Sequence, residues 1–126
     1  MEIAIGAALA LGVCGLGVIA GFERDRAFYP VMLIVIASYY DLFAVIGGDE
    51  SVLGIELAIS LGFAALAVLG FRVNLWLTVA GLLGHAGLDV FHGHVVTNPG
   101  LPSWWPMFCA SFDAVAGFYL LWALTF

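Results

Sequence analysis

Histidine and aspartate side chains recur at helical spacing in the run HAGLDVFHGH, which covers residues 85–94. Residues four and seven positions apart lie on one face of a helix, so His85, Asp89 and His92 would project from consecutive turns. Two histidines and one carboxylate form a recurring ligand set for zinc and for non-haem iron. The spacing therefore predicts a divalent metal site, with zinc or iron as the expected ion. His94 would point away from it.

Further ionisable residues interrupt the other apolar stretches. Asp113 follows Cys109 by four positions, and Glu56 and Asp41 lie in two separate stretches. We expect Asp113 and Glu56 to act as additional metal ligands or as the catalytic acid or base. Asp41 either joins a second ligand set or accepts a hydrogen bond from a neighbouring tyrosine, and Cys109 is either a ligand or an apolar filler. The expected metal ligands are thus Asp41, Glu56, His85, Asp89, His92 and Asp113.

The remainder of the chain is too apolar for a water-soluble domain. Of its 126 residues, 64% are hydrophobic and 10% are charged, against about 25% charged residues in typical soluble domains. The net charge is −6, with three arginines and no lysine. This charge excludes nucleic-acid binding, which needs basic residues to displace counterions. Membrane lipid is the expected partner of most of the surface.

Five apolar runs separated by short polar segments predict an all-α fold, a single transmembrane domain over residues 1–126. The expected helices cover residues 3–22, 29–47, 53–71, 75–93 and 104–126. Each is long enough to cross about 30 Å of hydrocarbon at about 1.5 Å per residue. The short connections predict that helices adjacent in sequence pack antiparallel.

The arginines predict an orientation. Arg24, Arg26 and Arg72 all lie in the first and third connecting segments, which are on the same side of a five-helix bundle. Basic segments stay in the cytoplasm, so the N-terminus would face outward and the C-terminus inward, in a bacterial inner membrane. The ionisable residues of the helices then fall within about the outer 15 Å of the membrane. No arginine shares that layer, so protons or a metal ion must neutralise the acids.

The segment 81–113 contains the motifs His85-x3-Asp89-x2-His92, Asn98-Pro99 and Cys109-x3-Asp113, and a Gly-x-Glu precedes it at residues 54–56. In these motifs the chain resembles a bacterial multi-spanning membrane family of unknown function. Family sequences often carry a second histidine directly after the equivalent of His92, where this chain has Gly93. The family implies no activity.

A looser similarity is to membrane hydrolases of the alkaline ceramidase and adiponectin-receptor type. These place serine, aspartate and three histidines of a zinc site inside seven helices. The similarity implies a metal-dependent hydrolase only by analogy, because the helix number and spacing differ.

Three functions fit these patterns. The first is a metal-dependent membrane enzyme that acts on a lipid-like or amphiphilic substrate near the extracytoplasmic face. The second is a proton or metal-ion transporter, which would need polar residues continuing to the cytoplasmic side, where Thr78 and the loop charges are the few available. The third is a non-catalytic metal-binding protein. A homodimer would help so short a chain to enclose a cavity.

Overall fold

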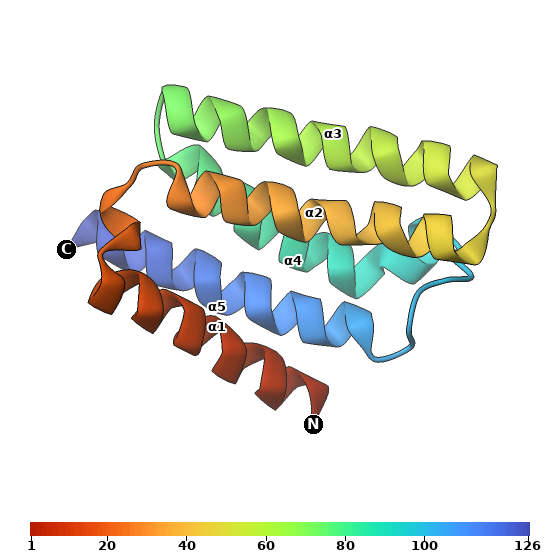
Figure 1. The fold of residues 1–126 in the computed structure, drawn as a ribbon, viewed down its shortest axis with the longest axis horizontal. Helices are drawn as coiled ribbons and strands as arrows, with labels where there is room; N and C mark the ends of the chain where they lie inside the picture. Colours follow the sequence, from red (N-terminus) through yellow and green to blue (C-terminus); the bar gives the residue numbers. More distant parts are fainter.

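The computed structural model describes all residues 1–126 and consists of five α-helices and one short 3-10 helix, arranged side by side (Figure 1). The elements are α1 (Glu2–Ala20), η1 (Phe22–Arg24), α2 (Phe28–Gly47), α3 (Glu50–Arg72), α4 (Trp76–Val95) and α5 (Trp105–Thr125). The all-α, five-helix prediction is therefore confirmed.

Four of the helices, α1, α2, α3 and α5, are long enough and apolar enough to cross a membrane. The helix α4 has a similar length of 20 residues, but the histidines and Asp89 make it less apolar. Only 30 of the 126 residues are buried, and large apolar side chains such as Ile19, Leu61 and Phe118 are 60–87% exposed. An apolar surface of this kind fits an integral membrane protein, in which lipid solvates the outward-facing side chains.

The packing order of the helices differs from their order in the chain. Sequential neighbours α2 and α3, α3 and α4, and α4 and α5 pack against each other, as expected. The helix α1 instead packs along α5 and runs parallel to it (Figure 1). Gly6 makes this possible, because a Cβ at that position would lie 2.3 Å from the carbonyl oxygen of Phe108. Small residues at such positions allow two helices to approach closely.

The helix ends differ from the predicted boundaries for local reasons. Gly21 and Gly48 adopt φ values of 83° and 75°, which end α1 and α2. Asp49 caps α3 by accepting the backbone N–H groups of Ser51 and Val52, so α3 begins at Glu50 instead of residue 53. A hydrogen bond from the Ser51 hydroxyl, together with that from the Val52 N–H, holds the pKa of the Asp49 carboxyl below its usual value.

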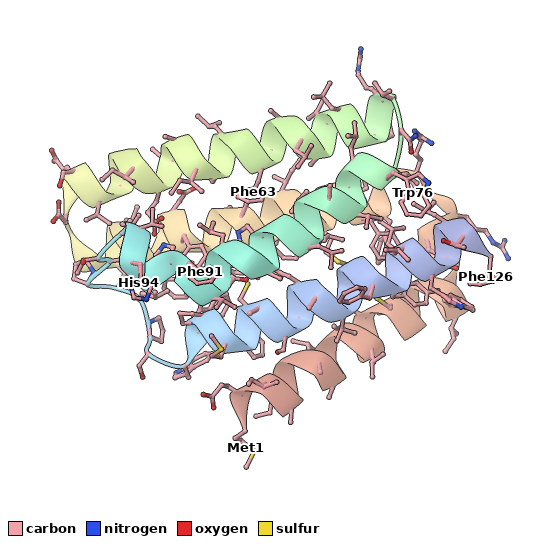
Figure 2. All side chains as sticks on the ribbon, turned by 180° about the vertical axis from the view of Figure 1, so that it is seen from behind. Met1, Phe63, Trp76, Phe91, His94 and Phe126 are labelled. Carbon is pink, nitrogen blue, oxygen red and sulfur yellow. The ribbon has the colours of Figure 1, made fainter.

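The arginine-bearing segments lie at one end of the bundle, which we call the arginine end. The guanidinium of Arg26 donates to the carbonyl oxygen of Phe71 and, at 3.4 Å, to that of Gly70, so it joins the first connection to the last turn of α3. Figure 2 places Trp76 and Phe126 toward this end and His94 toward the other, which we call the opposite end. The arginine-bearing segments therefore share one end of the molecule, as the sequence predicts.

Candidate metal site

Four ionisable side chains meet between α4 and α5. His85 and Asp89 extend from α4, and Cys109 and Asp113 extend from α5, each pair separated by one helical turn. One ligand atom from each residue lies within 4.8 Å of the others. All four residues are buried, with 0–3% of their surface exposed. We call these four residues the α4–α5 cluster.

The contacts within the α4–α5 cluster centre on the imidazole. The Nδ1 atom of His85 lies 2.6 Å from Oδ2 of Asp113 and 3.5 Å from Oδ2 of Asp89. The Sγ atom of Cys109 lies 3.7 Å and 3.8 Å from the two carboxylate oxygens of Asp113. Nitrogen, oxygen and sulfur donors thus surround one point, and the same atoms can share a proton or bind a metal ion.

The two oxygens of Asp89 are held differently. Its Oδ1 accepts a hydrogen bond of 2.5 Å from the Tyr40 hydroxyl. Its Oδ2 is buried and has no hydrogen-bond partner. A buried carboxylate oxygen without a donor is costly, and such groups call for an explanation. Coordination of a cation by Oδ2 would supply one.

His92 belongs to a second polar group. Its Nε2 atom lies 2.9 Å and 3.0 Å from the two carboxylate oxygens of Glu56 on α3. The side-chain amide of Asn98 donates to Oε2 of Glu56 at 2.8 Å and to the backbone carbonyl of Tyr40 at 3.2 Å. His92, Glu56 and Asn98 are 0%, 1% and 9% exposed. We call these three residues the Glu56 group.

The sequence grouped His85, Asp89 and His92 as one ligand set, and the structure divides this set. His92 lies nearer the opposite end of α4 than His85 does. At that depth the facing helix is α3, which supplies Glu56, whereas α5 supplies Asp113 at the depth of His85. The spacing along α4 shows that these side chains lie on one face of the helix. It does not show which neighbouring helix each side chain contacts.

Tyr40 connects the α4–α5 cluster with the Glu56 group. Its ring stacks on the His92 imidazole with centroids 4.0 Å apart and an interplanar angle of 12°. Its hydroxyl donates to Asp89, and its backbone carbonyl accepts from Asn98. Tyr40 is 2% exposed, so these contacts are shielded from the surroundings.

The connection between α4 and α5 brings Asn98 into this region. The backbone of Gly100 lies directly against α2, because a Cβ at Gly100 would lie 1.9 Å from the carbonyl oxygen of Phe43. The Gly100 N–H in turn donates to Oδ1 of Asn98 at 3.2 Å. The Asn98-Pro99-Gly100 segment therefore covers the Glu56 group at the opposite end of the bundle.

Asp41 lies outside both groups. Its Oδ2 accepts a hydrogen bond of 2.7 Å from the Ser60 hydroxyl on α3, and its Oδ1 has no hydrogen-bond partner. The structure thus gives Asp41 a serine neighbour, neither the tyrosine nor the second ligand set that the sequence suggested. His94 is exposed and points away from the α4–α5 cluster, as expected.

The residues of these polar groups to which sequence reasoning gave no site role are Tyr40 and Asn98, whereas Cys109 was left open between a ligand and an apolar filler. Tyr40 follows Leu33, Ile36 and Ala37 at helical spacing, and these residues form the buried face of α2. The helical spacing of these apolar residues therefore indicates from the sequence that Tyr40 is buried. Asn98 precedes Pro-Gly and therefore resembles an ordinary turn residue.

The chain matches no protein-family model, no curated protein and no solved structure. The resemblance to a bacterial membrane family of unknown function therefore stays a prediction. Functional inference rests on the geometry of the polar groups.

No arginine lies near the α4–α5 cluster, whose polar neighbours are Tyr40 and, beyond it, the Glu56 group. The arginines lie at the arginine end, where Arg26 is bound to backbone carbonyls. Toward that end, the residues that are 0% exposed include Leu33, Leu82 and Ala116, together with the hydroxyl-bearing Thr78. These residues separate the cluster from the arginine end. The imidazole of His85 is the only nitrogen base within the cluster.

Proposed function

We propose that the α4–α5 cluster binds one divalent metal ion within the membrane. The observation that carries the proposal is the meeting of four buried ligand atoms within 4.8 Å of one another, from two adjacent helices. Ionisable groups at membrane depth are costly unless they pair or bind an ion. The cluster offers one imidazole against two carboxyl groups and a thiol, and a divalent cation would offset that excess of acids.

Zinc is the ion that we propose for this site. It accepts histidine nitrogen, carboxylate oxygen and cysteine sulfur together in tetrahedral sites. Iron is less suited, because its common oxygen-activating sites use two histidines and one carboxylate, and His92 faces Glu56 at 2.9 Å instead of the cluster. The hydrogen bond from Tyr40 to Asp89 would orient that ligand while Oδ2 faces the ion.

We further propose that the protein is a metal-dependent enzyme, with the site in the extracytoplasmic half of the membrane and a lipid-like substrate. Bound zinc supplies a Lewis acid that polarises a carbonyl group or activates water. The Glu56 group would accept or donate the proton, because Tyr40, which stacks on His92 and binds Asp89, places this group beside the cluster. In this proposal Asp113 is a ligand that would give way to water or to the substrate oxygen, because a catalytic zinc keeps one position open. Glu56 acts with His92 as the acid or base.

One observation favours a second function, proton transport. Hydrogen-bonding side chains run from Asn98 through Glu56 and His92 to the stacked Tyr40, and on to Asp89. The buried residues Leu33, Leu82 and Ala116 would block such a path toward the arginine end. We therefore expect liposomes containing the protein to show no proton flux. A flux that Asp89→Asn abolishes would favour transport over catalysis.

Cobalt substitution tests the metal site. Co²⁺ replaces zinc in proteins, and its absorption spectrum contains a sulfur-to-metal charge-transfer band when a thiolate is bound. We expect this band in the wild type, its loss in Cys109→Ser, and its retention in Cys14→Ser. The control is matched, because both cysteines are buried, at 3% and 2% exposed.

Two results of the cobalt experiment would count against the proposal. A wild-type protein that shows no saturable binding of Co²⁺ or Zn²⁺ would leave the acids to be neutralised by protons alone. A charge-transfer band that survives in Cys109→Ser would remove Cys109 from the ligand set.

A further inference from the structure

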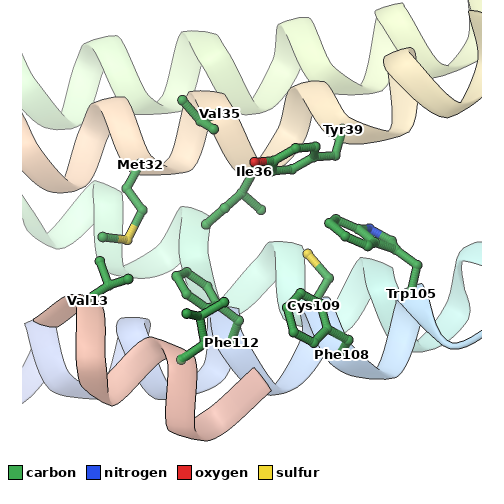
Figure 3. A pocket seen from close by; sticks show the side chains of 10 residues that line it. Val13, Met32, Val35, Ile36, Tyr39, Trp105, Phe108, Cys109 and Phe112 are labelled. Atoms are coloured by element: carbon green, nitrogen blue, oxygen red, sulfur yellow. The ribbon is translucent and has the colours of Figure 1, made fainter. Parts of the chain in front are cut away.

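A second feature of the molecule is an apolar pocket of about 510 Å³ between α1, α2 and α5 (Figure 3). All ten residues that line it are hydrophobic. Its volume lies within the range of about 300–1,000 Å³ that is typical of small-molecule sites. It exists because α1 packs on α5 and leaves a gap to α2 on the outer surface of the bundle.

The pocket opens toward the surroundings of the helices. Leu9 on α1 and Val35 on α2 line it and are 49% and 46% exposed. Because α1, α2 and α5 are all apolar enough to cross a membrane, the opening faces the hydrocarbon region when the helices span the bilayer. The molecules that can enter from there are lipid chains.

The inner wall of the pocket reaches the α4–α5 cluster. Cys109 lines the pocket, and its Sγ atom lies 3.7 Å from the Asp113 carboxylate. Figure 3 shows Cys109 between Phe108 and Trp105 on the same side of the pocket. A molecule in the pocket would therefore contact a residue of the proposed metal site.

Trp105, one of the lining residues, carries a polar group without a hydrogen-bond partner. Its indole Nε1 atom is buried in the pocket wall with no acceptor, so a rotation of the ring is needed to present the N–H to an occupant. A buried N–H group without an acceptor loses about 1–3 kcal/mol relative to a satisfied one. An occupant that carries a carbonyl or carboxylate oxygen would satisfy it.

We propose that this pocket binds the acyl chain of a fatty-acyl amphiphile taken from the bilayer, with its acyl oxygen near Trp105. The proposal names the substrate class for the site and rests on the proposed function for the link to metal chemistry. The hydrocarbon chain matches the apolar lining, the oxygen matches the Trp105 N–H, and Cys109 places the acyl group beside the α4–α5 cluster.

Photolabelling tests the pocket directly. The full chain in detergent micelles is illuminated with a fatty acid that carries a diazirine near its carboxyl group, and the labelled residues are located by mass spectrometry. We expect saturable labelling on the pocket segments of α1, α2 and α5, competed by excess unlabelled palmitic acid. Val35→Trp should reduce this labelling at least ~10-fold because the larger side chain fills the pocket.

The matched control is Val45→Trp, the same substitution on the same helix. Val45 is 60% exposed and does not line the pocket, so labelling should match the wild type. Labelling that is spread over the outer surface, is not competed, or is equal in both variants would overturn the proposal. A dimer that becomes monomeric in Val35→Trp would assign the pocket to a second copy of the chain and would also overturn it.

A second pair of variants tests the polar contact. Trp105→Phe removes the N–H group and keeps an aromatic ring. The control is Trp104→Phe, because Trp104 is the adjacent residue and is 51% exposed. We expect Trp105→Phe to lower labelling by the fatty-acid probe several-fold and to leave labelling by a purely hydrocarbon diazirine unchanged. Equal loss of both probes, or no loss, would contradict the hydrogen bond to the acyl oxygen.

The metal content of the same samples separates this proposal from the proposed function. Saturable labelling in a protein that binds no metal would retain the pocket and refute the metal site. Metal binding without pocket labelling would retain the metal site and refute the pocket.

Discussion

The Asp89 carboxylate shows how single residues define the candidate metal site. Tyr40 holds one oxygen at 2.5 Å, and the other faces the α4–α5 cluster without a hydrogen bond. A ligand that is oriented in this way binds a metal more tightly than a freely rotating one. Tyr40 is therefore a positioning residue in our proposal.

Removal of the Tyr40 hydroxyl should weaken metal binding. We expect Tyr40→Phe to lower zinc affinity by about 10- to 100-fold, the usual loss when a residue behind a metal ligand is removed. The ring would still stack on His92, so the fold should persist. A competitive titration against a fluorescent zinc chelator measures the affinity.

Tyr39→Phe is the control for this experiment. Tyr39 is adjacent in sequence and is 37% exposed, and it packs edge-on against Trp105. Its variant should bind zinc as the wild type does. Equal affinities of the Tyr40 and Tyr39 variants would mean that Tyr40 does not orient a metal ligand.

Sequence spacing predicted the polar residues of the site better than it predicted their partners. The distances between His85, Asp89 and Asp113 agree with the expected convergence of α4 and α5. The pairing of His92 with Glu56 was not predictable, because it depends on the rotation of α3 about its axis. From the sequence, Cys109 is either a ligand or an apolar filler. The choice could not be made because the distance from its sulfur to Asp113 depends on the direction of the side chain.

At the scale of whole helices, close packing of α1 on α5 depends on a single small residue. A Cβ at Gly6 would lie 2.1 Å from the Ser111 hydroxyl and 2.3 Å from the Phe108 carbonyl oxygen, and the second of these is backbone. We expect Gly6→Ala to force the helices apart and to lower the free energy of unfolding by about 1–3 kcal/mol. Unfolding in increasing sodium dodecyl sulfate, followed by circular dichroism, measures this change.

Gly12→Ala provides the matched control on the same helix. Nothing lies within 4 Å of a Cβ at Gly12. Alanine favours the helix by up to about 1 kcal/mol over glycine, so this variant should be as stable as the wild type or more so. Destabilisation of both variants to the same degree would show that helix propensity, and not the contact with α5, governs the result.

The helices were predictable from the sequence, whereas the packing of α1 against α5 was not. Apolar run lengths gave all five helices to within three residues at each end. Their short connections predicted three of the four sequential contacts, but the α1–α2 connection contains η1 and an extended Asp25. This connection lets α1 lie against α5, a choice that depends on surface shape around Gly6 and leaves no simple pattern in the sequence.

For the whole molecule, the asymmetric ends predict an orientation. Arg26 binds the last turn of α3, which carries Arg72, so the arginine-bearing segments share one end. From the positive-inside rule we predict that this end lies in the cytoplasm. We expect a C-terminal green fluorescent protein fusion to fluoresce and a C-terminal alkaline phosphatase fusion to be inactive in bacterial cells. Active phosphatase at the C-terminus would mean the reverse orientation and would place the α4–α5 cluster in the cytoplasmic half.

The most direct test of the metal site is the metal content of the protein as purified, without chelator, by inductively coupled plasma mass spectrometry. His85→Gln and His92→Gln make a matched pair, because both histidines lie on α4 and are 1% and 0% exposed. We predict about one zinc ion per chain in the wild type and in His92→Gln, and its loss in His85→Gln. A wild type without bound metal, or loss of metal in His92→Gln alone, would contradict the assignment of the site to the α4–α5 cluster.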